Sequence, residues 1–164
     1  MNLTTLLAAA LALLSSPGHA GAHPAPAAPQ ASTTSADESA VRAVLARYKS
    51  AIERLDAAGT ETLFTADSAI FETGGVEGTY ANYLAHHLGP ELAAFRSFAF
   101  SDYAMTVRVE GNFALATETY NYRIETKKGE IAERKGVATS VLTRTADGWK
   151  ILSMHNSARK PKGA

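Results

Sequence analysis

The sequence contains no cysteine, which excludes a disulfide bond, a thiol nucleophile and a thiolate metal site. It also has no excess of charge of either sign, because 16 Lys and Arg side chains balance 16 Asp and Glu side chains. A nucleic-acid-binding protein needs a basic face to displace counterions from phosphates, so we expect no nucleic-acid partner. The one basic cluster lies in a predicted tail at 159–164 and is interpreted as a solvated terminus.

No hydrophobic run is long enough to span a bilayer as a helix, which takes about 20 residues. The run Leu6–Leu14 instead fits the apolar core of a signal peptide, although no Lys or Arg precedes it. Ala20 and Ala22 form an A-x-A pattern that predicts a signal peptide over 1–22, with cleavage after Ala20 as the alternative. We therefore expect a periplasmic or secreted protein with no membrane contact after cleavage. A buried helix is the other interpretation of the run.

Residues 23–36 contain no large apolar side chain and are rich in Pro, Ala, Ser and Thr. Such a segment cannot bury enough surface to offset the entropy lost on ordering. We predict a disordered linker here, followed by one domain over 37–158. No cysteine follows the signal peptide, so a lipoprotein anchor is not expected.

Helical periodicity dominates the first part of the domain. An apolar stripe with three- and four-residue spacing predicts a helix over 36–58; it consists of Val41, Val44, Leu45, Tyr48, Ile52 and Leu55. A capping box at Ser35 and Glu38 would begin this helix and Gly59 would end it. A short helix over 60–64 and a strand over 69–71 are predicted next, followed by a helix that Thr79 caps and Gly89-Pro90 ends. One stripe of this helix is predicted to face the sheet; it consists of Tyr80, Tyr83, Leu84, His87 and Leu88. Pro90 would then begin one more short turn through Phe95.

Period-two alternation replaces helical periodicity after residue 97. Four strands are predicted over 98–110, 113–126, 130–144 and 149–158, separated by short turns that contain glycine. Successive strands joined by short turns are antiparallel neighbours, so these strands form a meander. With no second sheet to cover it, one face of the meander must pack against the helices. The predicted class is α+β.

This layout resembles the SnoaL-like proteins of the nuclear transport factor 2-like superfamily. The segments VRAVLARYKSAIERLDAAGTETLF and AIFE carry the resemblance near the start of the domain, and VATSVLTRTADGWKILSMHNS carries it near the end. The resemblance implies a cone-shaped fold, with N-terminal helices on a curved antiparallel sheet and a pocket at the open end. It implies no single activity, because members include isomerases, cyclases, dehydratases and non-catalytic modules.

Two residues are candidates for acid–base chemistry. Period two places His155 on the same face as Trp149 and Ile151, which predicts that it points into the cone; a structural histidine is the alternative. Glu118 would be a general base if its strand face is internal, because burial raises the pKa of a carboxyl group. Periodicity leaves open which face of 113–126 is internal, and a surface carboxylate is the other interpretation.

Further candidate lining residues are Tyr83, His87 and Tyr120, which supply rings with polar tips. His86 and His87 are adjacent, so they are not a metal-ligand pair at helical spacing. A zinc site of His87, His155 and a carboxylate is the alternative, but no ligand spacing supports it, and no metal is predicted. No phosphate-binding glycine loop or nucleophile elbow is present, and no cofactor is expected.

Together these features predict a pocket that binds a small, mostly apolar organic ligand, with no reaction assigned. The alternatives are an isomerase- or cyclase-type enzyme that uses His155 or Glu118 as general base, and a non-catalytic dimeric scaffold. A homodimer is expected in each case, because both faces of the last strand carry apolar residues, including Leu152 and Met154.

Overall fold

The structure is a computed structural model that describes residues 31–161. The predicted signal peptide, most of the predicted linker and the end of the basic tail lie outside the described residues. Among the described residues, no helix is long and apolar enough to cross a membrane.

The long helix α1 (Ala31–Glu53) buries the predicted stripe. Three residues of the stripe, Val41, Leu45 and Ile52, are almost inaccessible to solvent. The other three, Val44, Tyr48 and Leu55, are partly buried against the same core. The helix contacts β3 and β6 of the sheet described below. One amphipathic helix therefore fills the concave side of the sheet, as the spacing predicts.

The two ends of α1 differ from the predicted ends. The helix begins at Ala31, so the end of the segment predicted as a linker is helical. Asp37 explains this extension, since its carboxylate binds the guanidinium of Arg144 and accepts a hydrogen bond from Trp149 Nε1 at 3.3 Å. These contacts hold the first turns of the helix against the sheet, and the predicted capping box at Ser35 is wrong.

At its C-terminal end, α1 stops at Glu53 instead of Ala58. Leu55 adopts a left-handed backbone with φ of 56°, and its N–H donates to the carbonyl of Ile52. The N–H of Asp56 reaches back to the carbonyl of Ala51. This pair of bonds is a Schellman motif, in which Leu55 takes the left-handed position that the sequence assigns to Gly59, four residues later.

A hairpin and a broken helix follow. A 3-10 turn, η1 (Thr60–Leu63), leads into β1 (Phe64–Glu72), which pairs with β2 (Gly75–Gly78). The prediction contained only part of β1 and did not include β2. Thr79 then caps the next helix as predicted, because its side chain accepts a hydrogen bond from the N–H of Asn82.

This next helical segment runs through the predicted stop at Gly89-Pro90. It consists of α2 (Tyr80–Tyr83), the π-helical turn η2 (Leu84–Leu88) and α3 (Gly89–Ala94). The N–H of Gly89 donates to the carbonyl of Leu84, and a Cβ atom on Gly89 would lie 2.6 Å from that oxygen. Gly89 therefore permits the wide turn, and the helix continues past it instead of ending.

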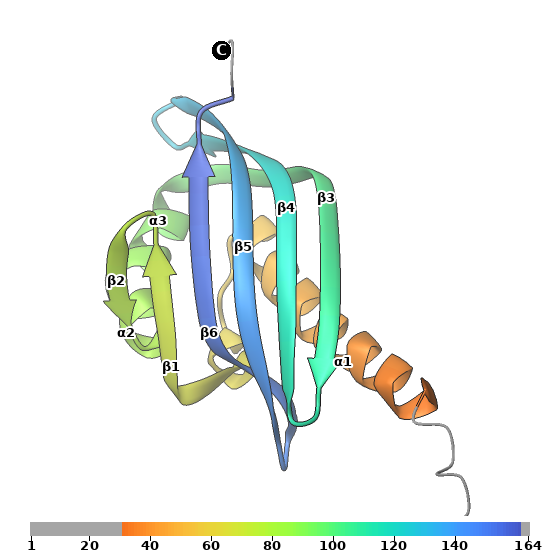
Figure 1. The fold of residues 1–164 in the computed structure, drawn as a ribbon. Helices are drawn as coiled ribbons and strands as arrows, with labels where there is room; N and C mark the ends of the chain where they lie inside the picture. The colour runs from red at the N-terminus through yellow and green to blue at the C-terminus, as the bar shows by residue number, and fades with distance from the viewer. Residues whose placement is uncertain (1–30, 162–164) are drawn as a thin grey trace, which may run out of the picture.

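The sheet consists of six strands in the order β2-β1-β6-β5-β4-β3. The four long strands are β3 (Phe95–Glu110), β4 (Phe113–Thr126), β5 (Ile131–Thr145) and β6 (Gly148–Arg159), and they form the predicted antiparallel meander. β1 joins the edge of this meander parallel to β6. Figure 1 looks onto the open face of the sheet, with α1 behind it. The predicted α+β fold is confirmed, with a mixed sheet.

Two β-bulges determine which side chains face α1. In β3 the pairing shifts between Ser101 and Ala104, and Asp102 takes a left-handed backbone with φ of 49°. In β6 the pairing shifts at Leu152, because Leu142 pairs with Ile151 and Val141 pairs with Ser153. Each extra residue reverses the alternation of the side chains that follow it.

Candidate functional site

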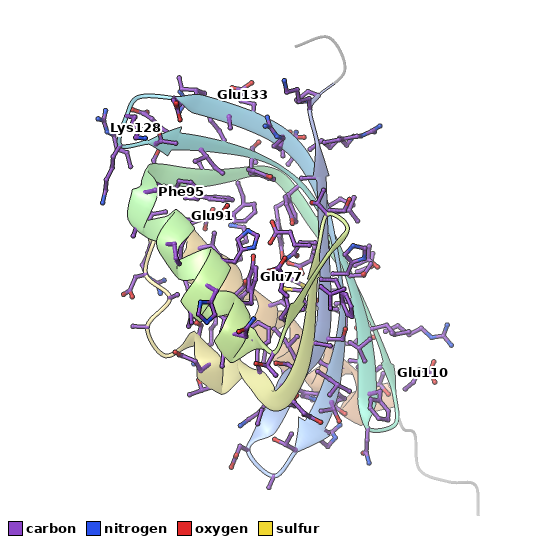
Figure 2. The ribbon with its side chains drawn as sticks, turned by 90° about the vertical axis from the view of Figure 1, so that its left-hand side faces the viewer. Glu77, Glu91, Phe95, Glu110, Lys128 and Glu133 are labelled. Atoms are coloured by element: carbon purple, nitrogen blue, oxygen red, sulfur yellow. The ribbon has the colours of Figure 1, made fainter. Side chains whose placement is uncertain are left out.

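A cavity of about 190 Å³ lies between α1, the segment α2–α3 and the concave side of the sheet. Its walls are mainly aromatic, and the rings belong to Tyr48, Tyr83, Phe95, Phe98, Phe100, Tyr120 and Tyr122. Figure 2 looks toward this side of the molecule and shows Glu91 and Phe95 at the end of α3, next to the curved strands. A cavity of about 150 Å³ is large enough for benzene, so this one accommodates a single ring with a small substituent.

Two carboxylates, Glu72 of β1 and Glu91 of α3, also line the cavity. The hydroxyl of Tyr83 donates a hydrogen bond to Glu72 Oε2 at 2.5 Å. Burial raises the pKa of the Tyr83 phenol well above its ordinary value, so Tyr83 stays protonated and remains a donor. The bond joins α2 to the end of β1 and fixes the orientation of the Glu72 carboxylate.

His87 lies at the rim of the cavity, between two carboxylates. Its Nδ1 is 3.2 Å from Glu77 Oε2, and its Nε2 is 3.5 Å from Glu91 Oε1. Burial lowers the pKa of His87, but the contacts with Glu77 and Glu91 outweigh burial and raise that pKa overall. His87 therefore ties the hairpin β1–β2 to α3, most strongly when it is protonated.

A smaller chamber of about 40 Å³ lies deeper in the cone, beside Glu118. Glu118 is only 6% exposed, and its carboxylate accepts a hydrogen bond from the hydroxyl of Tyr103. Burial raises the pKa of Glu118, while the Tyr103 hydrogen bond and the charge of Lys49 partly offset that rise. The Lys49 ammonium lies over the rings of Phe100 and Tyr103 and pairs with Glu53 at 2.7 Å.

Tyr48, Tyr120 and Asn156 line both the cavity and the inner chamber. Within the described part of the chain, neither tyrosine hydroxyl has a hydrogen-bond partner, and neither does the Asn156 side-chain amide. Burial raises the pKa of both phenols, so each hydroxyl is protonated at neutral pH. The site thus offers two hydroxyl groups and one amide to a ligand, within reach of a buried carboxylate.

Some of the predicted site residues line the cavity or the inner chamber, and others do not. Glu118 faces inward, which answers the question that periodicity left open, and Tyr83 and Tyr120 line the cavity. The prediction that His87 faces the sheet is wrong, because the π-helical turn moves Leu88 and Leu92 onto the buried face instead.

The prediction that His155 points into the cone is also wrong. The bulge at Leu152 turns Met154 and Asn156 inward, and it leaves His155 exposed on the outer face, beside the ring of Phe71. His87 and His155 are therefore not brought together as a zinc site would require. The described residues contain no group of three His, Asp or Glu side chains that could hold a metal ion.

Four residues of the site were absent from the predicted set: Tyr48, Glu72, Tyr103 and Asn156. Tyr48 was on the predicted helical stripe and could have been included on that basis. Glu72 directly follows the predicted strand, but no sequence pattern pairs it with Tyr83. Tyr103 and Asn156 face inward only because of the bulges that precede them.

Comparison with known proteins identifies the family. The model of the SnoaL-like domain family matches residues 41–160, which is most of the chain. The protein therefore belongs to the SnoaL-like family. No curated protein matches the sequence.

Solved structures agree with this assignment. A nuclear transport factor 2-like superfamily protein from Salmonella enterica serovar Typhimurium is 19% identical with a TM-score of 0.70, over 79% of this chain and 96% of that one. A conserved protein from Planctomyces limnophilus is 20% identical with a TM-score of 0.69, over 76% and 98%. A protein from Shewanella frigidimarina, described as a candidate ketosteroid isomerase, is 25% identical with a TM-score of 0.61, over 72% and 94%. These likenesses establish the nuclear transport factor 2-like fold.

Proposed function

We propose that this SnoaL-like domain binds a small, mostly apolar organic molecule in its aromatic cavity. The observation that carries the proposal is the composition of the cavity, in which seven rings and the aliphatic side chains of Ile52, Leu88, Leu92 and Ile124 surround a volume of about 190 Å³. Apolar walls supply affinity, while a few placed polar groups orient the ligand. Here Tyr48, Tyr120 and Asn156 supply those groups.

A screen of single-ring compounds by thermal shift tests this proposal, with hits repeated on two variants. Ala158 lines the cavity, so Ala158→Trp fills part of it; Ala146→Trp introduces the same side chain in an exposed turn. We expect hits that Ala146→Trp retains and Ala158→Trp loses. Hits that both variants retain would place binding elsewhere. The absence of hits, with a folded wild-type protein, would favour the dimeric scaffold.

The SnoaL-like fold is of a ligand-binding or isomerase type. An isomerase- or cyclase-type reaction is the second candidate function, and Glu118 favours it. A general base works best when burial brings its pKa toward the working pH, and burial raises the pKa of Glu118. The hydroxyls of Tyr48 and Tyr120 could donate to a developing oxyanion.

Binding is preferred over catalysis because the described residues that line the chamber beside Glu118 include no histidine and no second carboxylate. His155, the predicted partner, is on the outer face. Incubating a bound carbonyl compound in D2O distinguishes the two functions, since a base that removes a carbon-bound proton exchanges it for deuterium. Exchange that Glu118→Gln abolishes, while binding persists, would establish the enzyme. Binding of the compound without deuterium exchange would support a binding protein with no catalytic activity on that compound.

The domain is further proposed to work in the periplasm or outside the cell, after removal of residues 1–22. The apolar run Leu6–Leu14 and the A-x-A pattern ending at Ala22 support this proposal. Intact-mass measurement of protein exported by a bacterial host tests it. A mass that retains residues 1–22 would contradict cleavage at this site.

A further inference from the structure

The cavity has an unbalanced charge. Its lining includes the carboxylates of Glu72 and Glu91, and no Lys, Arg or His is among the described residues that line it. Glu72 is half-buried, and its Oε1 atom has no hydrogen-bond partner among the described residues, because Tyr83 donates to Oε2 alone. Burial raises the pKa of Glu91; the charge of His87 opposes this rise, and the charge of Glu72 adds to it. An apolar cavity thus carries negative potential that its own walls do not neutralise.

The nearby cationic side chains do not remove this imbalance. Lys49 belongs to the inner chamber and pairs with Glu53 at 2.7 Å. His87 lies outside the lining and divides its contacts between Glu77 and Glu91, so a single positive charge faces two negative ones. Burial raises the pKa of Tyr122, and the charge of Arg134 partly offsets that rise. Arg134 is also outside the lining, however, and its guanidinium donates to the carbonyl of Glu133.

The aromatic walls of the cavity, like the carboxylates, favour a positively charged ligand. The face of an aromatic ring is negative, so it attracts a cation placed over it. The protein already uses this attraction nearby, since the Lys49 ammonium lies 5.0 Å from the centroid of Phe100. Tyr120 and Tyr122 present further rings to the cavity next to Phe100. Rings and carboxylates together favour a positively charged occupant and oppose an anion.

We propose that the ligand of this cavity is an organic cation, an amine or quaternary ammonium compound with one ring or an apolar group of similar size. This inference rests on the proposed binding function and adds the charge of the ligand to it. The cationic group lies toward Glu72 and Glu91, next to the ring of Tyr83, and the apolar group packs against the rings of β3 and β4. The free Oε1 atom of Glu72 accepts the hydrogen bond of an ammonium group.

Three probes of matched size test the charge preference: benzylamine, benzyl alcohol and benzoate, titrated at neutral pH and followed by protein-observed NMR. We expect benzylamine to bind about tenfold more tightly than benzyl alcohol, the size that a cation–π contact and a partly exposed ion pair provide together. Benzoate should not bind. Equal binding of benzylamine and benzyl alcohol would overturn the cation inference and leave the proposed cavity function intact. Failure of all three probes up to millimolar concentration would count against both.

Glu72→Gln locates the preference in the cavity. Glutamine keeps an acceptor for Tyr83 but removes the charge, so benzylamine affinity should fall about tenfold while benzyl alcohol affinity stays the same. Glu133→Gln removes a carboxylate that is 59% exposed and absent from the cavity lining, and it should change neither affinity. If Glu72→Gln does not fold, Glu91→Gln makes the same test from α3. An unchanged ratio of the two affinities in a folded Glu72 or Glu91 variant would contradict the inference.

Discussion

Gly136 of β5 lies directly opposite Tyr120 of β4, and the ring of Tyr120 occupies the space that any larger residue at 136 would need. A Cβ atom on Gly136 would lie 2.2 Å from Cε2 of Tyr120, and 2.8 Å from Cδ2. Tyr120 is held from its other side by Phe100, with ring centroids 5.0 Å apart. The glycine therefore sets the position of a ring shared by the cavity and the inner chamber.

Gly136→Ala should consequently destabilise the domain by about 1–3 kcal/mol, the usual cost of overpacking a filled site. The added methyl group must push the Tyr120 ring toward Phe100 and into the cavity, so ligand binding should weaken as well. Urea unfolding measures the first effect, and NMR titration with a cavity ligand measures the second.

A double-mutant cycle isolates the contact with the ring. In a Tyr120→Ala background the space beside residue 136 is empty, so Gly136→Ala should cost little or nothing. An equal loss of stability in both backgrounds would show that the glycine serves the strand backbone instead of the ring.

The buried carboxyl of Glu118 should make stability depend on pH. Burial raises its pKa in the folded protein above the ordinary value of 4.5, so the folded state binds this proton more strongly than the unfolded state does. Stability attributable to Glu118 is therefore greatest below 4.5 and falls as pH rises through the folded-state pKa. Glu118→Gln removes the titration and still offers Tyr103 an acceptor. The variant should gain stability relative to wild type as the pH rises above 4.5.

Tyr103→Phe is the complementary test, because its hydroxyl lowers the pKa of Glu118. Without this donor the carboxylate should be less stable, so the pH dependence should become steeper and stability at neutral pH should fall by about 1–3 kcal/mol. Urea unfolding across the same pH range measures both variants. A stability difference between Glu118→Gln and wild type that does not change with pH would show that Glu118 is not the titrating group.

The sequence predicted the fold far better than the site. Strand existence depends on alternation over many residues, so the four long strands were predicted to within a few residues of their observed ends. The direction of a side chain depends on every residue before it in the strand, and one bulge reverses it. No glycine or proline stands beside Leu152 to indicate a bulge there. The sequence therefore predicts the wrong face for His155.

The helix after Thr79 shows the same limitation. The sequence predicted the start of this helix and its cap at Thr79. Helical spacing also predicted the buried positions of Tyr80 and Tyr83. The π-helical turn adds one residue to the period, and local sequence does not predict a turn that depends on Gly89 approaching the Leu84 carbonyl. In contrast, Gly136 within a predicted strand was a usable signal, since strand glycines mark close approaches.

The outer face of the sheet supports the proposal that the domain is a homodimer. Across the middle of this face, one row of paired residues on four adjacent strands contains no Lys, Arg, Asp or Glu; it runs from Thr106 across Thr117 and Thr139 to His155. Leu115 and Val137 are 52% and 41% exposed there. A face with β-branched and apolar residues at its centre is suited to a self-complementary interface.

A lysine at position 139 tests this interface. Thr139 is exposed at the centre of the face, so Thr139→Lys would bring two added positive charges together across a two-fold axis. We expect wild type to sediment as a dimer at micromolar concentration and Thr139→Lys to sediment as a monomer. Ala85→Lys adds the same charge on the exposed side of the helical segment and should stay dimeric. A monomeric wild type would refute the homodimer, and a dimeric Thr139→Lys would move the interface to another surface. The cavity opens on the opposite side of the sheet, so ligand affinity should be equal in the monomer and the dimer.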